Sequence, residues 1–195
     1  TEILIISTSE NLVYSERLFK DGSQWGLNIS YAIQKSPNGI AESFLIGEKF
    51  IGNSSVALIL GDNIFYGIDN DISLDNNNFK TGARVFAYNV PDPERYGVIE
   101  FEKEKIISIE EKPTNPKSSY VVTGLYFYDN KVIEISKSIE PSNRNELEIT
   151  DINLHYLNAN KLKANILKPG MVWLEAGTSN SLLQASHYVQ TIQER

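Results

Sequence analysis

Ser55-Val56-Ala57-Leu58-Ile59-Leu60 is a wholly apolar run that stops at Gly61-Asp62-Asn63. A short apolar run bounded by turn residues is typical of a strand buried on both faces, as in parallel sheets. Upstream lie two more strand patterns and two helical patterns, in the alternating order 2–8, 10–20, 28–33 and 39–50. This alternation of strands and helices predicts a parallel α/β sheet.

The pattern changes after residue 69. Residues 69–80 are rich in Asn and Asp and are expected to form a loop around a weak helix. Further strands are expected at 83–90, 97–101, 106–111, 121–128, 164–167 and 171–174, and helices at 130–137, 148–158 and 179–193. Without a repeat or a Pro-rich linker, we expect one domain, 1–195, with halves 1–68 and 69–195. The opening strand, 2–8, is expected to be buried, which predicts a neighbouring strand before Thr1.

Composition narrows the function classes. The net charge is -7, which argues against broad contact with a nucleic-acid backbone. Cysteine is absent, so thiolate nucleophiles, disulfides and Cys-type zinc sites are excluded, and His155 and His187 are too few for a His-rich metal centre. No apolar run reaches the roughly 20 residues of a membrane-spanning helix. We therefore expect a cytoplasmic protein that binds neither membranes nor nucleic acid.

Asp62 follows the decisive strand directly. In open α/β sheets, ligands bind beyond the carboxyl ends of the strands. A carboxylate there is well placed for Mg²⁺, which takes few carboxylates and completes its shell with water and phosphate oxygens. Asp62 can equally cap the following turn, and the local spacing does not decide between the two.

Three further segments carry candidate chemistry. In Glu110-Glu111-Lys112-Pro113, Lys112 can hold a phosphate while Glu111 accepts hydrogen bonds from hydroxyl groups. Such a group of charges usually forms only a solvated strand end. In Pro93-Glu94-Arg95-Tyr96-Gly97, Gly97 indicates either close approach of a ligand or a tight turn. In Trp173-Leu174-Glu175-Ala176-Gly177-Thr178, Thr178 is a natural helix N-cap and Glu175 can be a second metal carboxylate. Both histidines lie in helical patterns and are expected at the surface or packed.

Five motifs occur in the order in which they occur in glucose-1-phosphate thymidylyltransferases, and the chain resembles that family along its whole length. They are Leu60-Gly61-Asp62-Asn63-Ile64-Phe65-Tyr66-Gly67, Asp92-Pro93-Glu94-Arg95-Tyr96-Gly97-Val98, Glu110-Glu111-Lys112-Pro113, Val122-Thr123-Gly124-Leu125-Tyr126-Phe127-Tyr128 and Glu146-Leu147-Glu148-Ile149-Thr150-Asp151-Ile152-Asn153. The resemblance implies a Rossmann-like mixed, mainly parallel sheet flanked by helices. It also implies Mg²⁺-dependent transfer of a thymidylyl group from dTTP to glucose 1-phosphate, giving pyrophosphate and dTDP-glucose, a precursor of rhamnose, by a homo-oligomer.

The resemblance also assigns roles to residues. Gln34 and Gly39 correspond to the loop that reads thymine, and Leu60 and Asp62 to the nucleotide and metal contacts. The sugar contacts correspond to Tyr96, Gly97, Glu111, Val122, Glu146 and Trp173. Lys112 corresponds to the lysine that holds the sugar phosphate, and Glu175 to the second metal carboxylate.

Two departures from the family pattern qualify these roles. The family has Asp-Thr-Gly-Thr where this chain has Glu175-Ala176-Gly177-Thr178, and Glu is one methylene longer. The glycine-rich triphosphate loop and the catalytic lysine that open the family sequence have no counterpart, nor does the C-terminal segment. We therefore expect little turnover from these residues alone. The alternatives are a non-catalytic module that binds sugar nucleotides or a partner, and a uridylyl- or cytidylyltransferase.

Overall fold

The computed structural model describes residues 1–67, 81–168 and 170–194, which group into two units. Unit 1 comprises Thr1–Ser55 and Asn130–His155, and unit 2 comprises Val56–Asp129 and Tyr156–Arg195. The loop and weak helix expected at 69–80 lie outside the described residues. The division into halves 1–68 and 69–195 stays a prediction.

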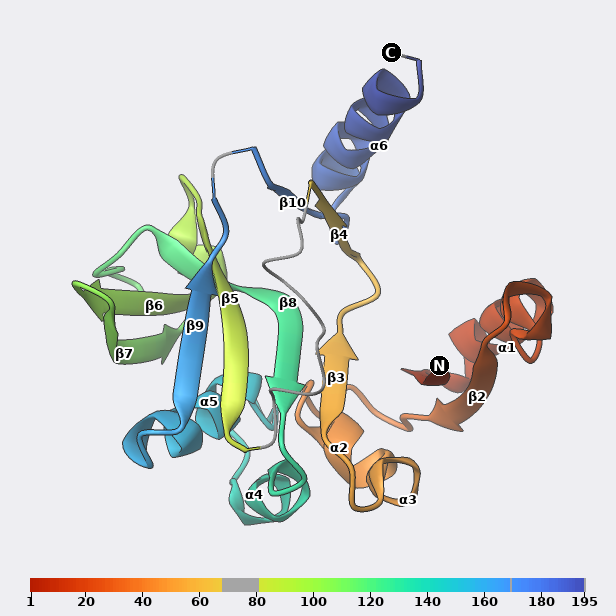
Figure 1. Cartoon of the computed structure of the whole chain (residues 1–195), viewed down its shortest axis with the longest axis horizontal. Helices are drawn as coiled ribbons and strands as arrows, with labels where there is room; N and C mark the ends of the chain where they lie inside the picture. The colour runs from red at the N-terminus through yellow and green to blue at the C-terminus, as the bar shows by residue number, and fades with distance from the viewer. Residues whose placement is uncertain (68–80, 169, 195) are drawn as a thin grey trace. The chain divides into compact units, whose positions relative to one another are not determined.

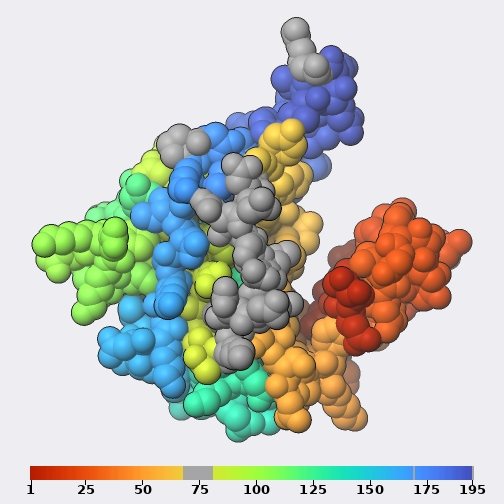
Figure 2. Space-filling view, in the orientation of Figure 1, coloured from red at the N-terminus to blue at the C-terminus, as the bar shows by residue number. Residues whose placement is uncertain are grey.

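Unit 1 opens with a parallel strand pair. β1 (Glu2–Ser7) pairs with β2 (Asn28–Ile33), and α1 (Ser9–Phe19) connects them, as expected from the sequence. These segments are red to orange in Figures 1 and 2. Within the described residues the strand is half-exposed rather than buried on both faces. The reason is that, within the described residues, β1 has β2 as its sole strand partner.

One predicted helix of unit 1 is divided in the structure. The single helix expected at 39–50 is two short ones, α2 (Glu42–Ile46) and α3 (Glu48–Ile51), which meet at Gly47. Glycine is a poor helix former, which explains the interruption. α4 (Val132–Ser138) packs against α2, and α5 (Ile149–Asn158) follows. Both lie where the sequence predicted helices.

Unit 2 is built on a sheet with β8 (Tyr120–Tyr128) at its centre. The strand order is β7 (Lys105–Glu111), β6 (Gly97–Glu102), β8, β5 (Ala83–Asn89) and β9 (Leu162–Ile166), with β3 (Val56–Ile59) also paired to β8. Figure 1 shows β5 between β8 and β9. Tyr126 and Tyr128 are buried and stacked with ring centroids 6.1 Å apart, which confirms that they pack a sheet face.

Strand direction differs from the expectation of a mainly parallel sheet. Among the described strands, β1–β2 and β5–β9 are parallel, whereas β3–β8, β5–β8, β6–β7, β6–β8 and β4–β10 are antiparallel. The apolar run of β3 does not show which way its partner runs, and that partner, β8, begins only at Tyr120. Nor is β3 buried on both faces as its sequence indicated, because Ala57 and Ile59 are exposed.

A second antiparallel pair in unit 2 was missed in the sequence. β4 (Asn63–Tyr66) pairs with β10 (Val172–Glu175), and Asn63 faces Glu175 in the register. α6 (Ser179–Gln193) follows β10. Its N-cap is Thr178, which exchanges hydrogen bonds with Ser181 in a capping box, as the sequence predicted. The strand expected at 171–174 is thus followed closely by the start of a helix.

Candidate functional site

Asp62 and Glu175 lie on either side of one point in unit 2. Asp62 precedes β4, Glu175 ends β10, and the backbone N–H of Ala176 donates to the Asp62 carbonyl at 2.7 Å. A Cβ atom on Gly177 would lie 2.5 Å from Glu175 Oε1 and 3.2 Å from Asp62 Oδ2. A larger residue than glycine would therefore fill the space that the two carboxylates flank. The strand pairing brings together two carboxylates that are 113 positions apart in the numbering, 62 and 175.

Two donors hold the other oxygen of Glu175. Arg95 Nη2 donates to Glu175 Oε2 at 3.0 Å, and Tyr96 Oη donates to the same oxygen at 2.9 Å. Arg95 is itself fixed by Asp92, at 2.9 Å, and lies over the Tyr96 ring, 5.1 Å from its centroid. Within the described residues, Oε1 of Glu175 accepts no hydrogen bond. Glu175 therefore presents one free oxygen towards Asp62.

Charge and burial shift the pKa of both donors. Burial, helped by the hydrogen bond to Glu175, raises the pKa of Tyr96 to about 12. The hydrogen bond to Asp92 raises the pKa of Arg95 above its ordinary value, with a smaller contribution from Glu175. Tyr96 is thus a neutral donor and Arg95 a fixed positive charge at neutral pH.

Asn63 connects the parts of this site, a role that the sequence reasoning missed. Its Oδ1 accepts from the indole N–H of Trp173 at 2.6 Å and from the backbone N–H of Gly124 at 3.0 Å. Its Nδ2 donates to Asp62 Oδ1 at 2.7 Å. A Cβ on Gly124 would collide with the Asn63 amide, so glycine is required there. Both Asn63 and Arg95 lie inside quoted motifs, but nothing local marked their partners.

Lys112 reaches the site through its backbone. Its N–H donates to the Tyr96 carbonyl at 3.0 Å, and it adopts a left-handed φ of 41°, uncommon for a residue with a side chain. The exposed ammonium group has no partner within the described residues. Glu111, the last residue of β7, faces Gly97 in the register. Hydrogen bonds therefore link the Lys112 backbone to Tyr96 and the Tyr96 hydroxyl to Glu175, which the backbone of Ala176 joins to Asp62.

The remaining predicted residues of unit 2 belong to the same strands. Trp173 is buried and packs edge-to-face on Tyr96, with centroids 5.3 Å apart. Leu60 donates its N–H to the Gly124 carbonyl at 2.9 Å, and Val122 lies buried on β8. The aromatic pair thus forms a wall beside Glu175.

Gln34, Gly39 and Glu146 form a separate group in unit 1. Gln34 Nε2 donates to the Gly39 carbonyl at 3.1 Å and to Glu42 Oε2 at 2.7 Å. Gly39 has φ of 104° and lies against the backbone of Leu147, the residue after Glu146. Both amide hydrogens of Gln34 are therefore used, and its oxygen Oε1 accepts no hydrogen bond from the described residues.

The chemistry of the carboxylate pair fits Mg²⁺ but not an all-protein metal cage. Within 1–67, 81–168 and 170–194, no group of three or more His, Cys, Asp or Glu side chains is arranged to hold a metal ion. Two carboxylate oxygens at one point suffice for Mg²⁺, which is usually bound by one or two carboxylates plus substrate phosphates and water. His155 and His187 are exposed on α5 and α6, as expected.

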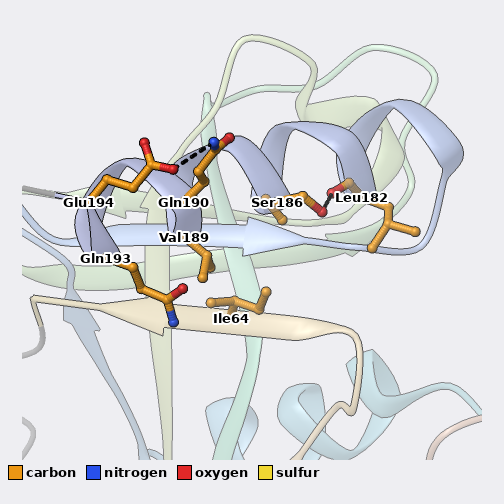
Figure 3. A pocket seen from close by; sticks show the side chains of 8 residues that line it. Ile64, Leu182, Ser186, Val189, Gln190, Gln193 and Glu194 are labelled. Carbon is orange, nitrogen blue, oxygen red and sulfur yellow. Dashed lines mark hydrogen bonds between the residues drawn. The ribbon is translucent and has the colours of Figure 1, made fainter.

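A separate hollow of about 380 Å³ lies between β4 and α6 (Figure 3). Ile64 of β4 faces Leu182, Val189 and Gln193 of α6 across it. None of the predicted site residues lines this hollow. No helix in the described part of the chain is long and apolar enough to cross a membrane.

Comparison with known proteins adds independent information. The sequence matches the nucleotidyl transferase family over residues 1–192. A glucose-1-phosphate thymidylyltransferase of Neisseria meningitidis is 52% identical over 194 residues, which cover 98% of this chain and 67% of that protein. One of Mycolicibacterium smegmatis is 50% identical over 195 residues, covering 100% of this chain and 68% of its own length. The chain spans about two thirds of these relatives.

Solved structures similar to this chain belong to the same class of enzymes. A Bacillus anthracis protein assigned as a glucose-1-phosphate thymidylyltransferase, in complex with sucrose, has a TM-score of 0.87 and 42% identity. The match covers 95% of this chain and 74% of that one. A UDP-glucose pyrophosphorylase complexed with UDP-glucose has a TM-score of 0.77 at 24% identity and supports the fold alone. These neighbours confirm the expected mixed α/β class of the nucleotide-sugar transferases.

Proposed function

Since this chain belongs to the nucleotidyl transferase family, among relatives named glucose-1-phosphate thymidylyltransferases, we propose that the protein that carries it transfers a thymidylyl group to glucose 1-phosphate. The observation that carries the proposal is the pair of carboxylate oxygens of Asp62 and Glu175 on either side of Gly177, beside the aromatic wall of Tyr96 and Trp173. Such a pair suits a phosphate-bound cation next to a sugar.

The reaction is an in-line displacement. A phosphate oxygen of glucose 1-phosphate forms a bond to the α-phosphorus of dTTP, while the bond to pyrophosphate breaks. No covalent nucleophile from the protein is needed, so catalysis consists of positioning and charge neutralisation. Lys112, whose ammonium group is exposed, is proposed to hold the sugar phosphate.

Mg²⁺ is proposed as the cofactor, held by Asp62 and Glu175. When bound, Mg²⁺ offsets the negative charge that phosphate oxygens carry in the transition state. The chain's own part is to hold the two carboxylates beside one point. The hydrogen bonds from Asn63 to Asp62 and from Tyr96 to Glu175 serve that purpose.

The sugar is proposed to bind along the end of β6, β7 and β10. Glu111 offers a carboxylate to the sugar hydroxyl groups, and Gly97, opposite it in the register, is proposed as a further sugar contact. Tyr96, Val122 and Trp173 supply apolar contact, and Leu60 contacts the nucleotide. The role of Glu146 as a sugar contact stays a prediction from the sequence.

Base recognition is proposed for Gln34 and Gly39. With both amide hydrogens engaged, Gln34 can offer only its oxygen, which is an acceptor. Thymine and uracil carry an N–H at N3, whereas cytosine carries an acceptor there. The arrangement therefore favours dTTP or UTP over CTP, and the thymine methyl alone would separate the first two by about 1–3 kcal/mol.

The test is pyrophosphate release by the protein that carries this chain, with glucose 1-phosphate and dTTP, UTP or CTP in turn. We expect the highest kcat/KM with dTTP, the next with UTP, and little release with CTP. Binding of dTDP-glucose without turnover on any nucleotide would support the non-catalytic module instead. Preference for UTP or CTP would overturn the thymidylyl assignment. The cytoplasmic location and homo-oligomeric assembly stay predictions.

A further inference from the structure

Glu175 is held by one oxygen only, and its two donors are themselves anchored. Arg95 is ion-paired with Asp92 at 2.9 Å, and the ring of Tyr96 packs on Trp173. Both donate to Oε2 of Glu175, at 3.0 and 2.9 Å. The longer glutamate arm, which would otherwise be free to rotate, is thus fixed at its end.

We propose that Arg95 and Tyr96 are positioning residues that restrict Glu175 to a single oxygen ligand and thereby set the preference of the cation site for Mg²⁺ over Ca²⁺. The inference rests on the proposed function, because it requires a divalent cation at Asp62 and Glu175. Neither Arg95 nor Tyr96 needs to touch the cation. Each acts by occupying the second oxygen of Glu175.

The physical reason is the difference between the two cations. Ca²⁺ takes 6–8 oxygen ligands and readily accepts both oxygens of one carboxylate, whereas Mg²⁺ requires a near-ideal octahedron at shorter distances. A glutamate with one oxygen already bound by two donors cannot chelate Ca²⁺ without breaking those hydrogen bonds. Mg²⁺ needs only Oε1, which faces the Asp62 carboxylate across Gly177.

We call the two hydrogen bonds that Arg95 and Tyr96 donate to Glu175 the tether. The charge of Arg95 has a separate effect on cation binding, which must be distinguished from the effect of the tether. The guanidinium of Arg95 repels any dication at this point, so its removal should strengthen Mg²⁺ and Ca²⁺ binding alike. The tether, in contrast, acts on Ca²⁺ selectively. The ratio of the Ca²⁺ and Mg²⁺ affinities therefore reports the tether, and Tyr96→Phe removes one tether hydrogen bond without any change of charge.

The experiment measures Mn²⁺ binding to the 195-residue chain by electron paramagnetic resonance of free Mn²⁺, with and without dTDP-glucose, and then displaces Mn²⁺ with Mg²⁺ or Ca²⁺. The variants are Tyr96→Phe and Arg95→Gln. Arg95→Lys keeps the charge, and Glu94→Gln changes a neighbouring charge outside the tether. Asp62→Asn shows that the measured Mn²⁺ occupies the site, and thermal melts show that each variant folds.

We expect Tyr96→Phe and Arg95→Gln each to move the Ca²⁺/Mg²⁺ affinity ratio towards Ca²⁺ by about 2- to 10-fold, the scale of one lost hydrogen bond. Arg95→Lys should move it less, and Glu94→Gln should leave it unchanged. If wild type binds Mn²⁺ but neither variant changes the ratio, the tether is overturned while the cation site stands. If wild type binds no Mn²⁺ in either condition, the proposed metal site fails and the inference fails with it.

Discussion

Arg144 and Glu148 of unit 1 form an ion pair that uses both carboxylate oxygens, whereas Arg95 and Glu175 of unit 2 use only one. Arg144 donates to Oε1 and Oε2 of Glu148 at 2.9 and 2.8 Å, and Ser142 adds a bond of 2.6 Å to Oε1. The two arginine side chains are similarly exposed, at 39% and 41%. The pairs therefore differ in the acceptor rather than in the donor.

The difference teaches how a structural ion pair can be told from a ligand site. Glu148 is 7% exposed and both of its oxygens are satisfied, so it has nothing left to offer a ligand. Glu175 keeps Oε1 free and aims it at a second carboxylate, an arrangement that costs electrostatic repulsion unless a cation joins it. The number of satisfied oxygens, not the presence of an arginine, separates the two.

The largest effect that this comparison predicts is on the carboxylate pair of Asp62 and Glu175. Asp62→Asn or Glu175→Gln should lower the rate of thymidylyl transfer about 10²–10³-fold, the usual cost of one electrostatic stabiliser. Pyrophosphate release by the protein that carries this chain measures it, and thermal melts should show little loss of stability. Near-normal rates in both variants would place the catalytic charge elsewhere.

For the Arg144–Glu148 ion pair we expect a loss of stability instead of a loss of activity. Glu148→Gln replaces a buried carboxylate that binds Arg144 through both oxygens, so we expect the free energy of unfolding to fall by about 1–3 kcal/mol even though Arg144 keeps Glu146 at 3.3 Å. Glu175→Gln, the matched control, should lower it by about 1 kcal/mol or less, because the Glu175 side chain is more exposed than that of Glu148, at 21% against 9%, and binds Arg95 through one oxygen. Urea unfolding of both variants gives the comparison directly. Equal losses would mean that both pairs are structural.

The sequence predicted the local features of the site because each depends on neighbouring residues. The carboxyl-end position of Asp62, the N-cap Thr178 and the helix at 179–193 all follow from local chemistry. The resemblance to glucose-1-phosphate thymidylyltransferases added the proposed joint role of Asp62 and Glu175, which no local pattern supplied.

The features that were missed depend on distant residues. β4 has only four residues, and its partner β10 begins at Val172. The tether on Glu175 depends on Arg95 and Tyr96, which β6 and its preceding 3₁₀ turn (Pro93–Arg95) place beside β10. Strand direction was missed for the same reason, since an apolar run does not name its partner.

A smaller effect is expected at Asn63, which donates a hydrogen bond to Asp62 of the carboxylate pair. Asn63→Leu would leave the N–H groups of Trp173 and Gly124 without their acceptor, so we expect a loss of about 1–2 kcal/mol in the free energy of unfolding. Asn63→Asp keeps the acceptor oxygen and should lose less stability, but it places a like charge beside Asp62. Urea unfolding ranks the two. A larger loss for Asn63→Asp than for Asn63→Leu would show that repulsion, not the orphaned N–H groups, dominates.

The smallest effect concerns the pH dependence of the tether. The pKa of Tyr96 is raised from 10.0 to about 12 in the folded protein. Between these values the folded state keeps a proton that the unfolded state has lost, so this group's contribution to stability is complete below pH 10 and is lost as the pH rises towards 12. Tyr96→Phe cannot titrate. Its unfolding free energy should therefore fall less steeply than that of wild type between pH 10 and 12, as measured by urea unfolding at several pH values.

Tyr14→Phe is the matched control for this measurement, since Tyr14 is a 69% exposed tyrosine of α1. The buried tyrosines of β8 are present in every variant, so they cancel from the difference. At neutral pH, Tyr96→Phe also loses its hydrogen bond to Glu175, which shifts the curve but does not change its slope. If Tyr96→Phe and Tyr14→Phe had the same slope as wild type, the phenol would not be held by Glu175, and the proposed tether would rest on Arg95 alone.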